Sequence, residues 1–220
     1  HGIKIISVAQ IITHRRLHEK MVQRVAEAKL PTAYGEFTAM AFQSDVDSSE
    51  HLALVIGDVD TEEPVLIRVH SECLTGDVFG SRRCDCGAQI NLALRLIAEE
   101  GRGVFLYMRQ EGRGIGLHNK IKAYALQDTG LDTVEANARL GFGPDLRHYG
   151  IGAQILVDLG VKSMRLLTNN PKKVIGLEAY GLKLMERVPI IVPTTPENAG
   201  YMKTKHLKMG HLLETEEAKG

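Results

Sequence analysis

The hydrophobic positions change their period along the chain. Between residues 25 and 70 they alternate with polar positions or form short apolar runs, namely EFTAMAFQ (36–43), HLALVIGDV (51–59) and PVLIRVH (64–70). Runs of this length and period, separated by polar turns, predict strands in a largely antiparallel arrangement. Beyond residue 87 the pattern changes to longer stretches of helical period that separate short apolar runs.

The second half of the chain therefore predicts alternating helices and strands. Helices are expected at 88–100, 116–128, 148–159 and 172–180, and strands at 103–109, 163–168 and 184–192. Gly101 and Gly160 stand where two of these helices would need C-terminal caps. The alternation predicts an α/β fold, in which a mixed sheet carries helices on both faces and its N-terminal portion is largely antiparallel.

The two ends of the chain are expected to lie outside this core. Residues 1–23 predict a short apolar strand at 3–5 and then a helix opened by a capping box at Ser7. They are too few to bury both elements, so we interpret them as the tail of a preceding domain or a linker. Residues 24–214 are expected to form one domain, and the last twenty residues a surface helix that frays at 215–220.

Composition limits the classes of partner. Basic and acidic residues both number 27, so the formal net charge is zero and no overall basic field attracts nucleic acid or an anionic membrane. No apolar run approaches the roughly 20 residues of a membrane span, and no signal peptide is visible. These features predict a cytoplasmic protein in which any polyanion site is local. The chain begins at His1 rather than at a methionine, which suggests a fragment.

All the cysteines stand in one short stretch, CLTGDVFGSRRCDCG, at positions Cys73, Cys84 and Cys86. A disulfide would leave one thiol over and is disfavoured in a cytoplasmic setting. Inert cysteines are common in protein cores, but charged and small polar residues surround these three. The pattern therefore favours a metal site, and thiolate ligands in an intracellular protein favour zinc.

The number of thiols bears on the kind of zinc site. Structural sites use four protein ligands, whereas catalytic sites keep one position for water. Three cysteines favour an open site with one Zn²⁺ per chain, unless His70, three residues before Cys73, or another histidine completes a closed one. A closed site would suit a zinc-stabilised module that binds nucleic acid or a protein partner. The zero net charge and the 5% aromatic content disfavour that alternative.

A glycine-rich stretch, RQEGRGIG (109–116), is a candidate ligand loop. Its glycines let the backbone approach a ligand closely, and it ends where a helix is predicted to begin, which is a favourable place for an anion. Glu111 and Arg113 add groups of opposite charge at the carboxyl end of a predicted strand, where α/β sheets bind ligands. A plain surface turn is the alternative.

Two further stretches carry candidate anion ligands. In TNNPKK (168–173), two lysines stand in the first turn of a predicted helix, where an incoming anion would explain them better than local stability does. In PDLRHYG (144–150), Asp145 precedes Arg147 by two residues. The plainer interpretation of this aspartate is a helix N-cap.

Several long motifs together resemble one enzyme family. The runs RVHSECLTGD, RCDCG, RQEGRGIGLHNKIKAYALQD, DTVEAN and LLTNNPKK resemble GTP cyclohydrolase II, over about residues 24–214. The resemblance implies a homodimer that converts GTP, with Zn²⁺ and Mg²⁺, to 2,5-diamino-6-(5-phosphoribosylamino)pyrimidin-4-one, formate and diphosphate, the first committed step of riboflavin biosynthesis. The run HGIKIISVAQIITHRRLHE resembles the tail of 3,4-dihydroxy-2-butanone 4-phosphate synthase. We therefore expect the C-terminal half of a bifunctional protein.

The resemblance also implies roles position by position. The implied zinc ligands are Cys73, Cys84 and Cys86. The implied substrate-binding residues are Arg68, Val69, His70, Ser71, Glu72, Gln89, Glu111, Gly112, Arg113, Thr133, Thr168 and Lys173. The implied catalytic residues are Asp145 as proton acceptor, Arg147 as nucleophile and Tyr124 near the reacting base.

The chemistry leaves two of these assignments open. The guanine N1 and N2 hydrogens need an acceptor, for which Glu111 is the first candidate and Gln89 the second. A guanidinium with a pKa above about 12 is a poor nucleophile, so Arg147 could instead hold the α-phosphate as a fixed cation. Arg68 and Lys173, with Mg²⁺ and with Arg113 as a further candidate, are expected around the triphosphate. No nucleic-acid partner and no membrane partner is expected.

Overall fold

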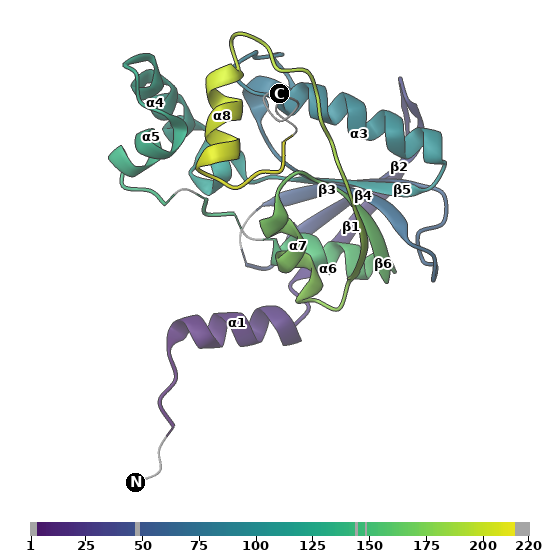
Figure 1. Ribbon diagram of the computed structural model, residues 1–220. Helices are drawn as coiled ribbons and strands as arrows, with labels where there is room; N and C mark the ends of the chain where they lie inside the picture. Colours follow the sequence, from purple (N-terminus) through teal and green to yellow (C-terminus); the bar gives the residue numbers. More distant parts are fainter. Residues whose placement is uncertain (1–3, 47–48, 144, 148, 214–220) are drawn as a thin grey trace.

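A computed structural model describes residues 4–46, 49–143, 145–147 and 149–213 of the chain (Figure 1). Its centre is a seven-stranded sheet in the order β1-β2-β3-β5-β4-β6-β7. The predicted α/β class, with a mixed sheet between helices, is confirmed.

One half of the sheet is antiparallel. It comprises β1 (Val22–Thr32), β2 (Gly35–Ser44), β3 (Glu50–Ile56) and β5 (Gly103–Met108), each antiparallel to its neighbour in that order. β1 was not predicted from the sequence. Only the first of its eleven residues is buried, so this edge strand lacks the alternation that would reveal it.

The other half of the sheet is parallel. It comprises β4 (Val65–Ser71), β6 (Ser163–Leu167) and β7 (Lys183–Val188), with β4 paired between β5 and β6. β4 therefore departs from the antiparallel arrangement expected for its stretch of sequence. Six of its seven residues are buried, as is usual for a parallel strand covered on both faces. β7 ends four residues before the predicted end of its strand.

Helices cover both faces of the sheet (Figure 1). On one face α3 (Cys86–Glu100) packs Ala93, Leu94 and Ile97 against strand residues that include Phe105. On the other face lie α6 (Gly150–Asp158) and α7 (Pro171–Glu178), whose apolar residues join the larger core cluster. The predicted glycine caps are present, since Gly101 and Gly160 follow α3 and α6 with positive φ angles of 72° and 87°.

Short elements gather beyond the carboxyl ends of the parallel strands. They are α2 (Leu74–Asp77), the 3₁₀ turn η1 (Glu111–Gly114), α4 (Gly116–Asp128), α5 (Thr133–Arg139) and α8 (Ala199–Leu207). α5 was not predicted from the sequence, and the C-terminal helix begins earlier than expected; residues 215–220, where that helix is expected to fray, lie outside the described residues. α8 is no simple surface helix, because Met202, Thr204 and Lys205 are buried.

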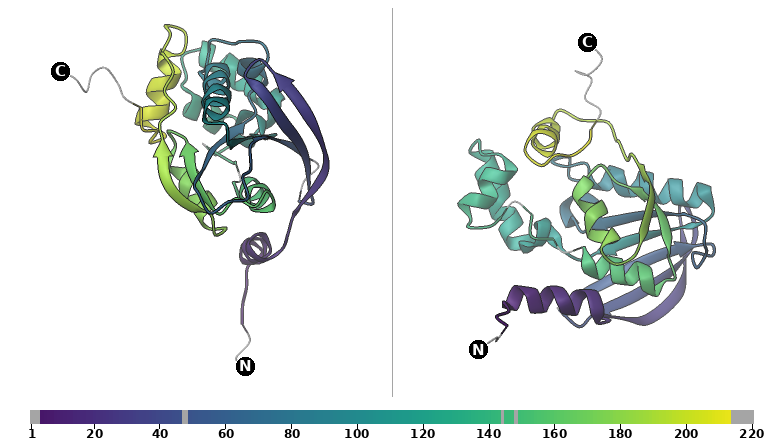
Figure 2. Two further views of the ribbon diagram at one scale, coloured as in Figure 1. Left: turned by 90° about the vertical axis from the view of Figure 1, so that its right-hand side faces the viewer. Right: turned by 60° about the horizontal axis from the view of Figure 1, so that its bottom comes forward.

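The N-terminal helix α1 (Val8–His18) projects from the body of the molecule (Figures 1 and 2). The predicted capping box is present: the Ser7 side chain accepts from the Gln10 amide, and the Gln10 side chain accepts from the Ser7 amide. The strand expected at 3–5 is absent from residues 4 and 5, and residue 3 lies outside the described residues. Across the described residues, the helices are all too short or too polar to cross a membrane.

Candidate active site

The strand order brings the predicted motifs to one edge of the sheet. β4 leads into Glu72 and Cys73, β5 leads into the loop that holds Glu111, and β6 leads into Thr168. Because these three strands are parallel neighbours, their carboxyl ends lie at the same edge of the sheet. Ligands of α/β sheets bind at that edge.

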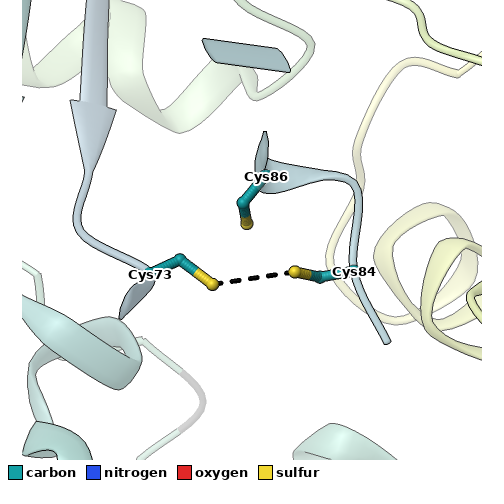
Figure 3. Close-up of side chains that lie close together, drawn as sticks. All are labelled: Cys73, Cys84 and Cys86. Atoms are coloured by element: carbon teal, nitrogen blue, oxygen red, sulfur yellow. Dashed lines mark hydrogen bonds between the residues drawn. The ribbon is translucent and has the colours of Figure 1, made fainter. Parts of the chain in front are cut away.

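The three cysteines converge at this edge (Figure 3). Their sulfur atoms all lie within 4.8 Å of one another, and Cys73 Sγ lies 3.6 Å from Cys84 Sγ. A disulfide requires about 2.05 Å, so the structure has three free thiols. A tetrahedral zinc ion with bonds of about 2.3 Å holds its sulfurs roughly 3.8 Å apart. The thiol cluster therefore fits a metal ion.

The start of α3 and a glycine in α2 leave space for the three sulfur atoms. Cys86 is the first residue of α3, so the start of this helix fixes the position of its thiol. Gly76 of α2 lies beside the sulfurs, and a Cβ at that position would come within 2.7 Å of Cys84 Sγ. A glycine is therefore required here by space rather than by its backbone angles.

Lys120 of α4 supplies the counter-charge. Its ammonium donates to Cys73 Sγ at 3.1 Å and to Glu111 Oε1 at 2.8 Å, and the residue is buried. Although burial opposes it, the bond to Glu111 and the charge of Cys73 raise the pKa of Lys120. The pKa of Cys73 is lowered by hydrogen bonds from Cys84 and Cys86 and by Lys120, whereas the pKa of Cys86 is raised. Negative charge is thus concentrated on Cys73.

His70 does not complete the cluster. Its Nε2 lies 3.2 Å from Asp77 Oδ1, and burial lowers the pKa of the ring. The same carboxylate accepts from the Cys73 amide at 2.8 Å and from the Tyr107 hydroxyl at 2.9 Å. Among the described residues, the group able to hold a metal contains the three cysteines alone. His70 and Asp77 instead fix the backbone at Cys73.

A first pocket opens beside the thiols. α4 contributes Tyr124, whose hydroxyl shares a 3.2 Å hydrogen bond with Thr75 Oγ1 and whose ring is covered by Arg83, 5.0 Å from its centre. Burial raises the pKa of Tyr124, so its hydroxyl stays protonated at neutral pH. Thr133, the first residue of α5, and Glu111 also line this pocket.

A second pocket adjoins the first and is strongly cationic. Five basic side chains line it, against one carboxylate, that of Asp85; the basic residues are Arg68, Arg113, Arg147, Lys173 and Lys205. Burial lowers the pKa of Lys173 well below its ordinary value, and the charges of Arg68, Arg147 and Lys205 lower it further. The pocket therefore favours an anionic ligand.

Hydrogen bonds fix the cations of this anion pocket. Arg68 donates to the Leu167 carbonyl at 2.8 Å and to Gln89 Oε1 at 2.6 Å, and Gln89 Nε2 donates to Asp85 Oδ2 at 2.7 Å. Lys173 Nζ donates to the Val69 carbonyl at 2.8 Å. Pre-set donors of this kind bind a phosphate without reorganising.

Arg147 stands between the two pockets and lines both. Its Nε and Nη2 donate to the two oxygens of Asp145 at 2.8 and 2.6 Å. The glycine-rich loop supports this pair, because the Leu146 amide donates to the Arg113 carbonyl at 3.0 Å. Arg113 itself has a φ of 62°, a left-handed conformation that is uncommon outside glycine.

The structure brings the sequence-predicted residues to this one site. All of them line one or both pockets except Val69, which contributes its carbonyl, and Asp145, which holds Arg147. Sequence reasoning missed Lys120, Tyr201, Lys205 and His211. Lys120 could have been found, since it lies on the same face of the predicted helix as Tyr124. The other three lie far along the chain, and no local pattern marks them.

The fold and the site define a class: an α/β protein in which a cluster of three cysteines able to hold a metal ion adjoins a cationic pocket for an anionic ligand. The family model of GTP cyclohydrolase II matches residues 23–189. The chain belongs to this enzyme family. Membership favours an enzyme over the alternative of a zinc-stabilised binding module.

Similar proteins agree with this assignment. The chain is 61% identical over 211 residues to the riboflavin biosynthesis protein RibBA of Bacillus cereus, covering 96% of this chain and 53% of that protein. For RibBA of Chlorobium phaeovibrioides the identity is 59% over 212 residues, with coverages of 96% and 52%. The chain thus spans about half the length of the curated relatives it matches.

A solved structure shares the fold. RibBX, a two-domain 3,4-dihydroxy-2-butanone 4-phosphate synthase from A. baumannii, superposes with a TM-score of 0.51 at 24% sequence identity. The match covers 85% of this chain and 47% of that one. At this identity the likeness bears on the fold alone.

Proposed function

We propose that the chain hydrolyses GTP to 2,5-diamino-6-(5-phosphoribosylamino)pyrimidin-4-one, formate and diphosphate, as a zinc-dependent enzyme of riboflavin biosynthesis. One observation carries the proposal beyond family membership. The pocket at the thiol cluster and the anion pocket share five lining residues, Ser71, Cys86, Arg113, Arg147 and Tyr201. One nucleotide can therefore present its base to the thiol cluster and its phosphates to the cations.

Cys73, Cys84 and Cys86 would hold one Zn²⁺ per chain. When bound, the ion supplies Lewis acidity and a water molecule of lowered pKa, which the two hydrolytic steps at the purine ring require. Three thiolates would weaken a Lewis acid by their charge. Lys120, 3.1 Å from Cys73 Sγ, offsets part of that charge from the protein side.

Glu111 is the proposed acceptor for the guanine base. Its Oε1 already accepts from the Gly112 amide and from Lys120, and its Oε2 accepts from the Leu74 amide, at 2.7 to 2.8 Å. A carboxylate offers about four acceptor sites, so Oε2 has room for one further N–H. Gln89, the second candidate, is engaged by Arg68 and Asp85. Glu111 therefore remains the better candidate, and it would accept a hydrogen bond from one guanine N–H group rather than from two.

The anion pocket is the proposed site of the triphosphate. Arg68 and Lys173 are buried there, and Arg113 has a buried Nη1 atom with no protein partner among the described residues. A phosphate oxygen would give that nitrogen the acceptor it lacks. Mg²⁺ would accompany the triphosphate and neutralise the charge that these side chains do not.

Arg147 admits two roles that experiment can separate. Although burial opposes it, the double hydrogen bond to Asp145 raises the pKa of Arg147, so the guanidinium remains charged. A charged guanidinium supports the α-phosphate electrostatically and is a poor nucleophile. The family role of nucleophile requires Asp145 to remove a proton first. A phosphoguanidino adduct detected by mass spectrometry would exclude the purely electrostatic version.

The proposal is tested by product analysis. The chain supplied with GTP, Zn²⁺ and Mg²⁺ should release formate and diphosphate. Arg147→Lys should lose most diphosphate release, because lysine cannot reproduce the double bond to Asp145. Arg95→Lys, at an exposed arginine of α3, is the matched control and should behave as the unmodified chain. A chain that binds GTP and forms neither product would contradict the proposed function.

The surroundings of the site complete the proposal. We expect a homodimer without a nucleic-acid partner, and a domain that runs from 24 to 214, past the end of the family match. Burial of Met202 and Lys205 in α8 supports that extension. Residues 1–23 would then be the tail of a preceding domain.

A further inference from the structure

The C-terminal segment lines the anion pocket although it lies beyond the region that the family model matches. That match ends at residue 189, whereas Tyr201 and Lys205 of α8, and His211 after it, line the pocket. Lys208, at the end of α8, is ion-paired with Asp132 and Glu135 at the start of α5. The segment is therefore held by ion pairs at two places, to α5 through Lys208 and to Asp85 through Lys205.

Lys205 is the charged residue that this segment places in the pocket. The residue is 7% exposed, and its ammonium donates to both oxygens of Asp85, at 2.9 and 2.8 Å. Asp85 stands between the cysteines of the C-x-C motif and also accepts from Gln89, which holds Arg68. A lysine ammonium has three hydrogens. Asp85 accepts from this ammonium, the centre of the Tyr201 ring lies 5.2 Å from it, and Lys205 also lines the pocket.

The pocket around Lys205 has more positive charge and more donors than its protein partners satisfy. Among the described residues that line the pocket, buried atoms without a hydrogen-bond partner include Arg113 Nη1 and His211 Nδ1. The His211 ring is 9% exposed and lines the pocket. Burial lowers its pKa to about 3, and the nearby charges of Lys205, Arg113, Arg147 and Lys173 contribute. The four cations around the His211 ring create a positive potential at this end of the pocket, which an anion would offset.

We propose that Lys205 is a further substrate-binding residue, which contacts a phosphate group of the nucleotide in the pocket that it lines together with Arg68 and Lys173. The inference rests on the proposed function for the identity of that nucleotide. Its rival is that Lys205 only fixes Asp85 and the cysteine motif. The two differ in what they affect: a phosphate ligand changes phosphate affinity alone, whereas a support for the motif changes metal binding and base binding as well.

The test compares two probes on the zinc-loaded chain, inorganic triphosphate and guanosine, by titration calorimetry. Lys205→Gln should weaken triphosphate binding roughly 10-fold to 100-fold, the worth of one charge-assisted hydrogen bond. Guanosine affinity and zinc content should change less than about twofold. Lys205→Arg should recover most triphosphate affinity. Lys203→Gln, at an exposed lysine of the same helix, is the matched control and should change neither.

Two results would overturn the inference. One is an unchanged triphosphate affinity in Lys205→Gln. The other is an equal loss of triphosphate and guanosine affinity together with loss of zinc, which would assign Lys205 to support of the cysteine motif. Should that variant not fold, the unmodified chain labelled with ¹³C at the lysine Cε carries the test. The Lys205 signal, assigned with Lys205→Arg, should move with triphosphate and not with guanosine, and an unmoved signal refutes the contact.

Failure of this inference and failure of the proposed function are distinguishable. A chain that releases formate from GTP, while Lys205→Gln binds triphosphate normally, loses the inference alone. A chain that forms no formate, yet binds triphosphate in a Lys205-dependent way, loses the proposed function and keeps the phosphate contact.

Discussion

Lys120 joins the thiol cluster to the proposed base site, and its removal gives a quantitative test of the site's electrostatics. The ammonium lies 3.1 Å from Cys73 Sγ and 2.8 Å from Glu111 Oε1, and the Lys120 and Glu111 side chains are each 9% exposed. Lys120→Met keeps most of the side-chain volume and removes the charge. The change leaves a thiolate and a carboxylate close together without their shared cation.

The free-energy cost of Lys120→Met depends on the burial of the ion pair and on the hydrogen bonds that Glu111 keeps. Removing one partner of a buried ion pair costs about 3–5 kcal/mol. Glu111 still accepts from the Leu74 and Gly112 amides, so the cost should lie near the lower limit. Part of this free energy should appear as weaker metal binding. Replacing a residue that contacts a metal ligand typically lowers metal affinity about 10-fold to 100-fold.

The assay is competition for Zn²⁺ between the metal-free chain and a chromophoric chelator. Lys120→Met should bind zinc about 10-fold to 100-fold more weakly than the unmodified chain. Lys122→Met, at an exposed lysine of the same helix, is the control and should leave zinc affinity unchanged. Unfolding by urea, with the metal absent, measures the remaining loss of stability separately.

Zinc affinity within about twofold of the unmodified chain would refute this reasoning. It would mean that Lys120 is not a functional counter-charge for the thiolates. A loss of stability without a loss of zinc affinity would restrict the role of Lys120 to holding Glu111.

Three further outcomes are expected. Cys84→Ser should lose zinc and formate release, and a metal-free variant that still releases formate would exclude the metal role. Gly76→Ala should fold but bind zinc poorly, because its Cβ would meet Cys84 Sγ at 2.7 Å, whereas alanine at Gly200, where space is open, should change little. Asp145→Asn should lower the free energy of unfolding at pH 7 by about 1–2 kcal/mol. Burial acts to raise the pKa of the Asp145 carboxyl, but the hydrogen bonds and charge of Arg147 outweigh burial and lower that pKa below 3.8. The stability difference between Asp145→Asn and the unmodified chain, measured by urea unfolding, should therefore be complete above pH 3.8 and should vanish as the pH falls through the lower pKa of the folded state.

Much of the fold was predictable because its signals are local. The capping box at Ser7 and the apolar run of β5 are written in adjacent residues. β1 was not predictable in this way, since an exposed edge strand takes its stability from pairing with β2 rather than from an apolar face. α5 had a readable signal that was overlooked, the capping box between Asp132 and Glu135.

The site residues also differ in whether a local sequence signal marks them. Cys73 was predictable from the clustering of the three cysteines, and Glu111 from its place at the carboxyl end of a predicted strand. Lys205 was not, because its partner Asp85 lies 120 residues away and only the packing of α8 brings them together. A buried lysine on a polar helix looks like a solvated one until the tertiary structure is known.

The central claim is that a metal held by the three cysteines is required for ring hydrolysis. The most direct measurement strips the chain of metal, restores Zn²⁺ in steps, and follows formate release from GTP with Mg²⁺ present throughout. The account predicts no formate from the stripped chain and a linear recovery that saturates at one zinc per chain. Formate release at the full rate without zinc would contradict it.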